Sequence, residues 1–133
     1  MAKNRQSLLN GVSEISSDKQ KIDNDLRFSF KHLDTTQGQT FQDWQTEGIL
    51  ADALETMRGY CTQTLGKAVS KKFSIYNNFP PKSDFHHPKH VSPEACWARI
   101  HISGLRCLGG HIVHNTFYVV FLDKNHRFFI SEP

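Results

Sequence analysis

Three closely spaced runs of strand-forming residues near the C-terminus constrain the fold of this chain more than any other feature. The runs read WARIHIS (97–103), RCLGGHIV (106–113) and FYVVFL (117–122), and only two or three residues separate one from the next. Because β-branched and aromatic residues favour pleated structure and short connections join antiparallel neighbours, the runs predict consecutive antiparallel strands. The polar turn DKNH at 123–126 precedes a last short predicted strand at 127–130.

The preceding part of the chain predicts a first strand and then helices. Apolar and polar residues alternate over 26–33, which is typical of a half-buried strand. Apolar residues at helical spacing over 50–61 predict a helix that Asp43 or Thr46 could cap, and Gly66 indicates a break before a second helical stretch. Residues 73–76 fit a short edge strand, and the proline-rich remainder up to residue 95 fits a long loop.

The expected fold is therefore α+β, with a small antiparallel sheet of about four strands and one or two helices packed on one face. The other face of this sheet is expected to be partly open, with Trp97, Arg99 and His101 projecting from it. In the run 117–122, Tyr118 is expected on the face opposite Phe117, Val119 and Phe121.

Length and composition favour one domain in a reducing compartment. At 133 residues a single domain is expected over 25–133, preceded by a polar mobile tail or short helix over 1–24. No apolar run approaches the roughly 18–20 residues of a membrane span, and the N-terminus lacks the hydrophobic segment of a secretory signal. We therefore expect no membrane partner, and three cysteines without CxxC spacing favour a reducing, cytoplasmic location.

Charge is distributed unevenly along the chain. Residues 1–55 carry 6 Lys/Arg and 9 Asp/Glu, whereas residues 56–133 carry 10 Lys/Arg, 4 Asp/Glu and seven of the eight histidines. A basic half of this kind is typical of proteins that bind a polyanion, and we expect RNA as the partner. The alternative is an ordinary solvated surface.

Basic and aromatic side chains gather on the C-terminal strands and turns. They are Arg99, His101, Arg106, His111, His114, Tyr118, Lys124, His126 and Arg127. Cleavage of an RNA phosphodiester requires a base, an acid and cations around the phosphate, and these side chains can supply all three without a metal or cofactor. Arg99 and His101 are expected on the same face of one strand, about 7 Å apart. The alternative is that they form only the solvated side of the sheet.

The sequence favours two other chemistries less. The sequence HHPKH places His86, His87 and His90 close to Cys96, a spacing that allows a zinc site, but it lacks the paired ligands of a structural site, so a surface loop is preferred. Cys96 or Cys107 could act as a nucleophile beside a histidine, but neither lies in a nucleophile-elbow context.

The closing block WARIHISGLRCLGGHIVHNTFYVVFLDKNHRFF and the order of elements over 26–130 resemble the RelE/ParE-type toxin domain of bacterial toxin–antitoxin modules. The resemblance implies a β-α-α-β-β-β fold and, in the nuclease branch of that superfamily, RNA bound on the concave sheet. By position, Arg99 and Arg106 would bind phosphate. Tyr118 would stack or assist, and His126 would be the acid or base. The implied partners are mRNA, free or on the ribosome, and an antitoxin protein.

The leading hypothesis is a toxin-type, metal-independent endoribonuclease that cleaves mRNA on the basic face of the sheet. Its catalytic candidates are His126, Tyr118, His101 and His111, and its phosphate-binding candidates are Arg99, Arg106, Arg127 and Lys124. The alternative is a non-catalytic module that binds RNA or a protein with the same face. A third possibility is a metal-dependent protein organised by the loop at 86–90.

Overall fold

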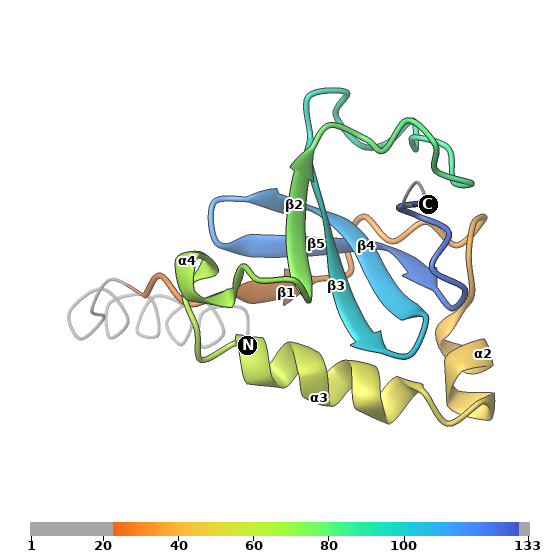
Figure 1. Cartoon of the computed structure of the whole chain (residues 1–133), viewed down its shortest axis with the longest axis horizontal. Helices are drawn as coiled ribbons and strands as arrows, with labels where there is room; N and C mark the ends of the chain where they lie inside the picture. The colour runs from red at the N-terminus through yellow and green to blue at the C-terminus, as the bar shows by residue number, and fades with distance from the viewer. Residues whose placement is uncertain (1–22, 131–133) are drawn as a thin grey trace, which may run out of the picture.

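The computed structural model describes residues 23–130, so nearly all of the predicted tail at 1–24 lies outside the described residues. Within this range, three helices follow a short first strand and precede four further strands (Figure 1). The elements are β1 (Arg27–Ser29), α2 (Phe41–Thr46), α3 (Leu50–Tyr60), α4 (Leu65–Ala68), β2 (Phe73–Asn77), β3 (Cys96–Ser103), β4 (Arg106–Val113) and β5 (Thr116–Asp123). The predicted α+β class is confirmed.

The sheet is larger than predicted and is mixed. Its five strands lie in the order β1-β5-β4-β3-β2; β1 pairs parallel to β5, and the other pairs are antiparallel. The expected four-stranded antiparallel sheet is therefore wrong. A strand pattern in the sequence does not specify its neighbour, and the long segment between β1 and β5 supplies the crossover that parallel strands need. The first strand is also shorter than the predicted 26–33, because the chain turns where Leu33 N–H donates to Phe30 O (3.1 Å).

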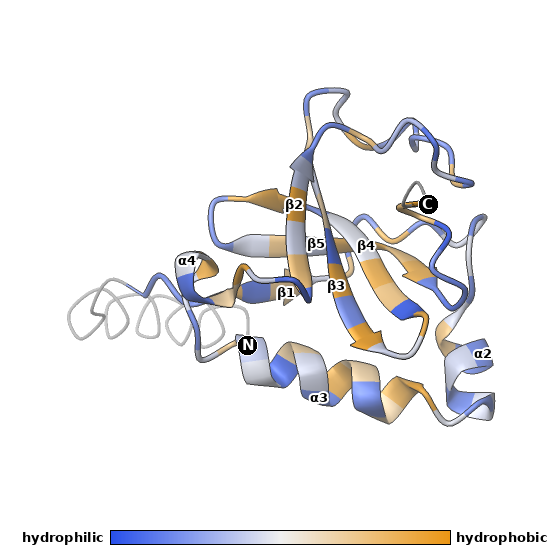
Figure 2. Cartoon of the chain, viewed as in Figure 1, coloured by the Kyte–Doolittle hydropathy of each residue, from blue (hydrophilic) through white to orange (hydrophobic). Residues whose placement is uncertain are grey.

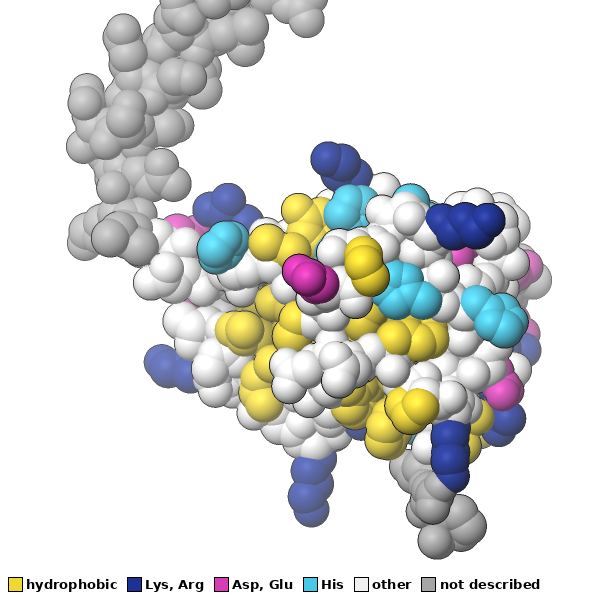
Figure 3. All heavy atoms as spheres, turned by 90° about the horizontal axis from the view of Figure 1, so that it is seen from above, with side chains coloured by type: hydrophobic (Ala, Val, Ile, Leu, Met, Phe, Trp, Pro, Cys, Tyr) yellow, Lys and Arg dark blue, Asp and Glu magenta, His cyan; other side chains and the backbone are white. Residues whose placement is uncertain are grey.

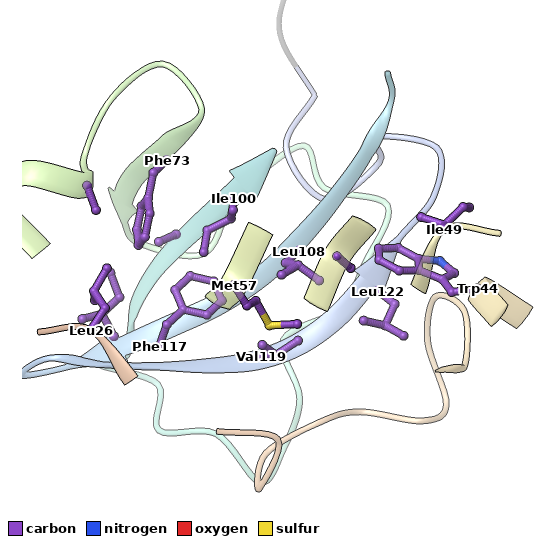
Figure 4. Close-up of a cluster of buried hydrophobic side chains, with 14 residues drawn as sticks. Leu26, Trp44, Ile49, Met57, Phe73, Ile100, Leu108, Phe117, Val119 and Leu122 are labelled. Atoms are coloured by element: carbon purple, nitrogen blue, oxygen red, sulfur yellow. The ribbon is translucent and has the colours of Figure 1, made fainter. Parts of the chain in front are cut away.

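Helices cover one face of the sheet and bury the first hydrophobic core, which Figure 4 shows in close-up. From α3, Ala53 and Met57 point into this core, whereas Leu54 is 48% exposed, so the apolar stripe is narrower than the sequence suggested. Figure 2 shows the resulting alternation of hydrophilic and hydrophobic bands along α3. The largest fully buried members of this core are Leu26, Trp44, Phe73, Ile100, Leu108, Phe117, Val119 and Leu122.

A short helix that the sequence did not predict precedes α3. Thr40 and Asp43 form a capping box at the start of α2: the Thr40 hydroxyl accepts from Asp43 N–H (3.1 Å) and the Asp43 carboxylate accepts from Thr40 N–H (2.9 Å). Gly48, with φ of 74°, then separates α2 from α3. The predicted cap of α3 by Asp43 or Thr46 is wrong, because Ile49 occupies that position and makes no side-chain cap.

The second face of the sheet is covered, not open. The loop at 78–95 and the segment after β5 fold over it and bury a second hydrophobic core: Phe85, Val91, Trp97, Val120, Phe121 and Phe128, with Tyr76, Phe79 and Ala95 packed against it. The prediction of a partly open face is wrong because Trp97, expected to be exposed, is 0% exposed beneath the ring of Phe79 (ring centroids 4.9 Å apart). In Figure 1 this loop lies on the opposite side of the sheet from α3.

An irregularity in the pairing of β4 with β5 explains why Phe121 joins the second core. Gly109 pairs with Phe121 and Gly110 pairs with Val119, so Val120 is an extra residue on β5. The bulge shifts the alternation of β5, and Phe121 faces away from Phe117 and Val119, against expectation.

The prediction of a last strand at 127–130 is wrong: these residues are irregular chain that follows a tight turn at 124–126. The buried carboxylate of Asp123 accepts hydrogen bonds from the backbone N–H groups of Arg127 (2.9 Å) and Phe128 (2.8 Å). His126 occupies the left-handed region within this turn (φ 58°). The turn thus directs Phe128 into the second core instead of along β5.

Candidate functional site

Two groups of polar side chains lie on the second face of the sheet, at different places. We call the first the arginine–histidine pair; it consists of Arg99 and His126. We call the second the histidine cluster; it consists of His32, His87, His90, His111 and Tyr118. Seen from above, histidine side chains lie beside hydrophobic ones on this side of the molecule, and Lys and Arg side chains lie around the rim (Figure 3).

The arginine–histidine pair joins β3 to the turn after β5. Arg99 Nη1 lies 2.6 Å from His126 Nε2, and Arg99 Nη2 donates to Lys71 O (3.2 Å) and Ser74 Oγ (3.3 Å). A guanidinium has donors only, so His126 Nε2 must accept, which fixes a neutral imidazole with a lone pair directed at Arg99. Both side chains are half-buried and thus reach solvent. A phosphate anion can replace His126 as the partner of this guanidinium.

Three further polar side chains surround the pair. Ser74 is the cross-strand neighbour of Arg99 in the β2–β3 ladder. Burial raises the pKa of Tyr76, whose hydroxyl is buried without a hydrogen-bond partner in the described chain. Burial also raises the pKa of the Cys107 thiol to about 12, which leaves it protonated and unsuited to act as a nucleophile. Sequence reasoning missed Ser74 and Tyr76; the predicted edge strand 73–76 was the available signal, but its register was not known.

The other predicted phosphate-binding cations lie at the same end of the sheet as His126. Arg106 and Lys124 line a shallow cleft of about 210 Å³ with Leu105 and Asn125. Lys124 is paired with Glu47 of the α2–α3 connection, and Arg127 is paired with Asp84 of the loop at 78–95. Two of these cations are therefore held by carboxylates that a phosphate would have to displace.

The histidine cluster is built around two imidazoles in direct contact. His32 Nδ1 lies 2.9 Å from His111 Nε2, with the rings only 9° from parallel. One nitrogen donates and the other accepts, so this contact requires one proton between the two atoms. Tyr118 stacks on both imidazoles, with ring centroids 4.4 Å from His32 and 4.9 Å from His111.

Burial and neighbouring histidines disfavour charge in this cluster. Burial, followed by His32, His87 and His90, lowers the pKa of His111 to about 4. The pKa of His32 is also lowered, by burial first and then by Lys31 and His90. His111 is 4% exposed, and its Nδ1 has no hydrogen-bond partner in the described chain. His32 and His111 are therefore both neutral at pH 7.

The predicted catalytic residues are thus distributed over three places. His126 lies against Arg99, whereas His111 and Tyr118 lie together in the histidine cluster. His101 belongs to neither group: its Nε2 donates to Gly104 O (2.7 Å). Sequence reasoning missed His32, because nothing in its local pattern indicates contact with a residue 79 positions later.

The histidines of the sequence HHPKH point to different partners. His90 Nε2 donates to His32 O (2.8 Å), and His87 Nδ1 donates to Pro88 O (2.9 Å). Over residues 23–130, no group of three or more His, Cys, Asp or Glu side chains is arranged to hold a metal ion. Nor does any helix in that range have the length and apolar character needed to cross a membrane.

Comparison with known proteins adds no relative, since no protein-family model, curated protein or solved structure matches the chain.

Proposed function

We propose that this protein is a metal-independent endoribonuclease whose working centre is the arginine–histidine pair. The supporting observation is the 2.6 Å contact between Arg99 Nη1 and His126 Nε2 in a position that reaches solvent. It combines a phosphate-binding guanidinium with a neutral imidazole, the form of histidine that can act as a general base.

The chemistry follows from this pairing. When a phosphate of RNA binds Arg99, His126 Nε2 loses its donor and is free to take the proton of the neighbouring 2′-hydroxyl. The 2′-oxygen then bonds to phosphorus, the bond from phosphorus to the 5′-oxygen breaks, and a 2′,3′-cyclic phosphate results. The leaving 5′-oxygen takes its proton from solvent, because the Tyr76 hydroxyl is buried and does not reach the surface where RNA binds. Arg99 neutralises the charge that develops on the phosphate.

The surrounding cations support RNA as the substrate class. Arg106 and Lys124 lie at the same end of the sheet as His126, within a half of the chain that has six more Lys/Arg than Asp/Glu. The narrower predictions, that the substrate is mRNA and that an antitoxin partner covers the site, rest on the sequence resemblance alone and stay predictions.

The test uses His126→Asn, because asparagine tolerates the left-handed conformation of this turn and accepts a hydrogen bond but is not a base. We expect purified protein to cut an RNA oligonucleotide in the presence of EDTA and to leave a 2′,3′-cyclic end. The variant should lose about 10²-fold or more of this activity while its RNA affinity is retained. His114→Asn is the matched control, since His114 also has a positive φ (56°) but belongs to neither group.

The second candidate is a module that binds RNA without cutting it. It is favoured by one observation: the predicted acid–base residues His111 and Tyr118 lie in the histidine cluster and not beside His126. RNA that binds the unmodified protein but stays intact would support this module and reject the nuclease. Equal cutting by His126→Asn and the unmodified protein would reject His126 as the base.

A further inference from the structure

The loop at 78–95 is attached to the rest of the molecule at two places. On one side, the Gln37 side chain bonds to both backbone groups of His86 (2.7 and 2.9 Å), and His90 donates to His32 O. On the other side, Asp84 N–H donates to Arg127 O (3.0 Å) and the Asp84 carboxylate pairs with Arg127. The loop contains no helix or strand of its own.

Apolar contacts hold the middle of the loop against the sheet. Phe85 and Val91 are buried in the second core, and the Phe85 ring lies 4.6 Å from that of Phe121. Phe79 and His87 both pack edge-on to Trp97, at 4.9 and 5.3 Å. The loop therefore seals Trp97 and the aromatic face around it from solvent.

The histidine cluster lies at the first of the two attachments. It joins the segment after β1 through His32, strand β4 through His111, and the loop through His90 and His87. Because the contact between His32 and His111 needs one unprotonated nitrogen, full protonation replaces a hydrogen bond by two cations in contact.

We propose that the loop at 78–95 is a strap that the histidine cluster holds closed at neutral pH and releases when the cluster takes up protons. This inference does not depend on the nuclease activity. Release uncovers Trp97 and the neighbouring rings of the second core, and thereby creates an aromatic surface that the closed form lacks. Histidine is suited to such a switch because its ordinary pKa lies near neutrality.

Other charged groups around the cluster also favour release of the loop when the cluster is protonated, with one exception. Lys31 and His90 both disfavour a positive charge on His32, and His87 and His90 disfavour one on His111.

The exception is Asp34, which faces His90 from the segment after β1. Burial raises the pKa of Asp34, but hydrogen bonds from Thr36 and Gln37 keep it below its ordinary value, so it stays ionised and attracts a protonated His90. Tyr118 contributes an uncharged ring to the cluster. The repulsion between His32 and His111 acts between nitrogen atoms that lie 2.9 Å apart.

The direction of the pH effect follows from the lowered pKa of His111. In the closed form this pKa is about 4, whereas an exposed histidine has its ordinary value near 6.5. Between these values the released form binds more protons than the closed form, so a falling pH favours release. The closed form is fully favoured above this window.

Tryptophan fluorescence can follow the strap directly. The chain has two tryptophans, and Trp44 lies in the first core while Trp97 lies under the strap, so Trp44→Phe leaves one local reporter. We expect acrylamide quenching of Trp97 to rise roughly twofold or more between about pH 7.5 and about pH 4.5, with an unchanged far-UV circular dichroism spectrum. In the chain with both tryptophans, deuterium uptake should rise over 78–95 and not over 96–103.

Two further variants, made in the Trp44→Phe background, test whether the histidine cluster causes the rise in quenching. His32→Asn removes one of the two cations but leaves the burial of His111, so it should reduce the rise in quenching above about pH 4.5, whereas His114→Asn, outside the cluster, should leave the rise unchanged. The proposal is overturned by quenching that does not depend on pH, by the same transition in His32→Asn, or by loss of the circular dichroism signal in step with quenching. If Trp44→Phe does not fold, the same test can compare deuterium uptake over 78–95 in the unmodified protein and in the single variant His32→Asn.

Discussion

Single residues set how closely the central strands approach. A Cβ on Gly110 would lie 2.2 Å from Tyr118 O and 2.6 Å from the Phe117 ring, and neither the backbone nor the buried ring can move away cheaply. We therefore expect Gly110→Ala to lower the free energy of unfolding by about 3 kcal/mol, measured by urea denaturation.

Gly59 in α3 provides the opposite comparison. A Cβ there meets no atom within 4 Å, so Gly59→Ala should raise the free energy of unfolding by about 0.5–1 kcal/mol. Equal effects of the two substitutions would contradict the close approach of β4 to β5.

Some residues of the candidate site could be predicted from the sequence, and others could not. Arg99 and His126 were both singled out by residue type and by their places on a strand and a turn, but their contact depends on how the turn folds back over the sheet. His32 and Ser74 were not singled out, because each becomes informative only through its partner on a distant segment. Strand register and the packing of loops, which local patterns do not encode, decide such contacts.

Among the elements, the strands with strong alternating patterns were predicted well, and the short or irregular ones were not. Strands β3, β4 and β5 and helix α3 lie where the sequence placed them. Helix α2 has six residues, too few for a periodic signal, and depends on its capping box. The proline-rich loop was identified, but its burial of the second core was not, since its few apolar residues have no regular spacing.

The capping box of α2 supports a testable prediction. Thr40→Ala removes the acceptor for Asp43 N–H, so we expect a loss of about 1 kcal/mol in the free energy of unfolding. Thr40→Ser keeps the hydroxyl and should be close to neutral. A thermal melt of the three proteins compares them, and equal melting temperatures for Thr40→Ala and Thr40→Ser would show that the hydroxyl does not stabilise α2.

For the whole molecule, the uneven charge distribution matters more than the net charge of +3. Each phosphate contact that Arg99 or Arg106 makes with RNA should release counterions, so that affinity falls with salt concentration. Alanine at either position should weaken binding and reduce the slope of log affinity against log salt by about 0.7 for single-stranded RNA. Arg58→Ala is the control, since it removes the same charge from the exposed side of α3, where Arg58 pairs with Glu55. If all three variants reduce the slope equally, RNA responds to net charge alone and the end of the sheet that carries His126 is not its binding site. If only Arg99→Ala and Arg106→Ala reduce it, binding is confined to that end, where the proposed base can reach the bound phosphate.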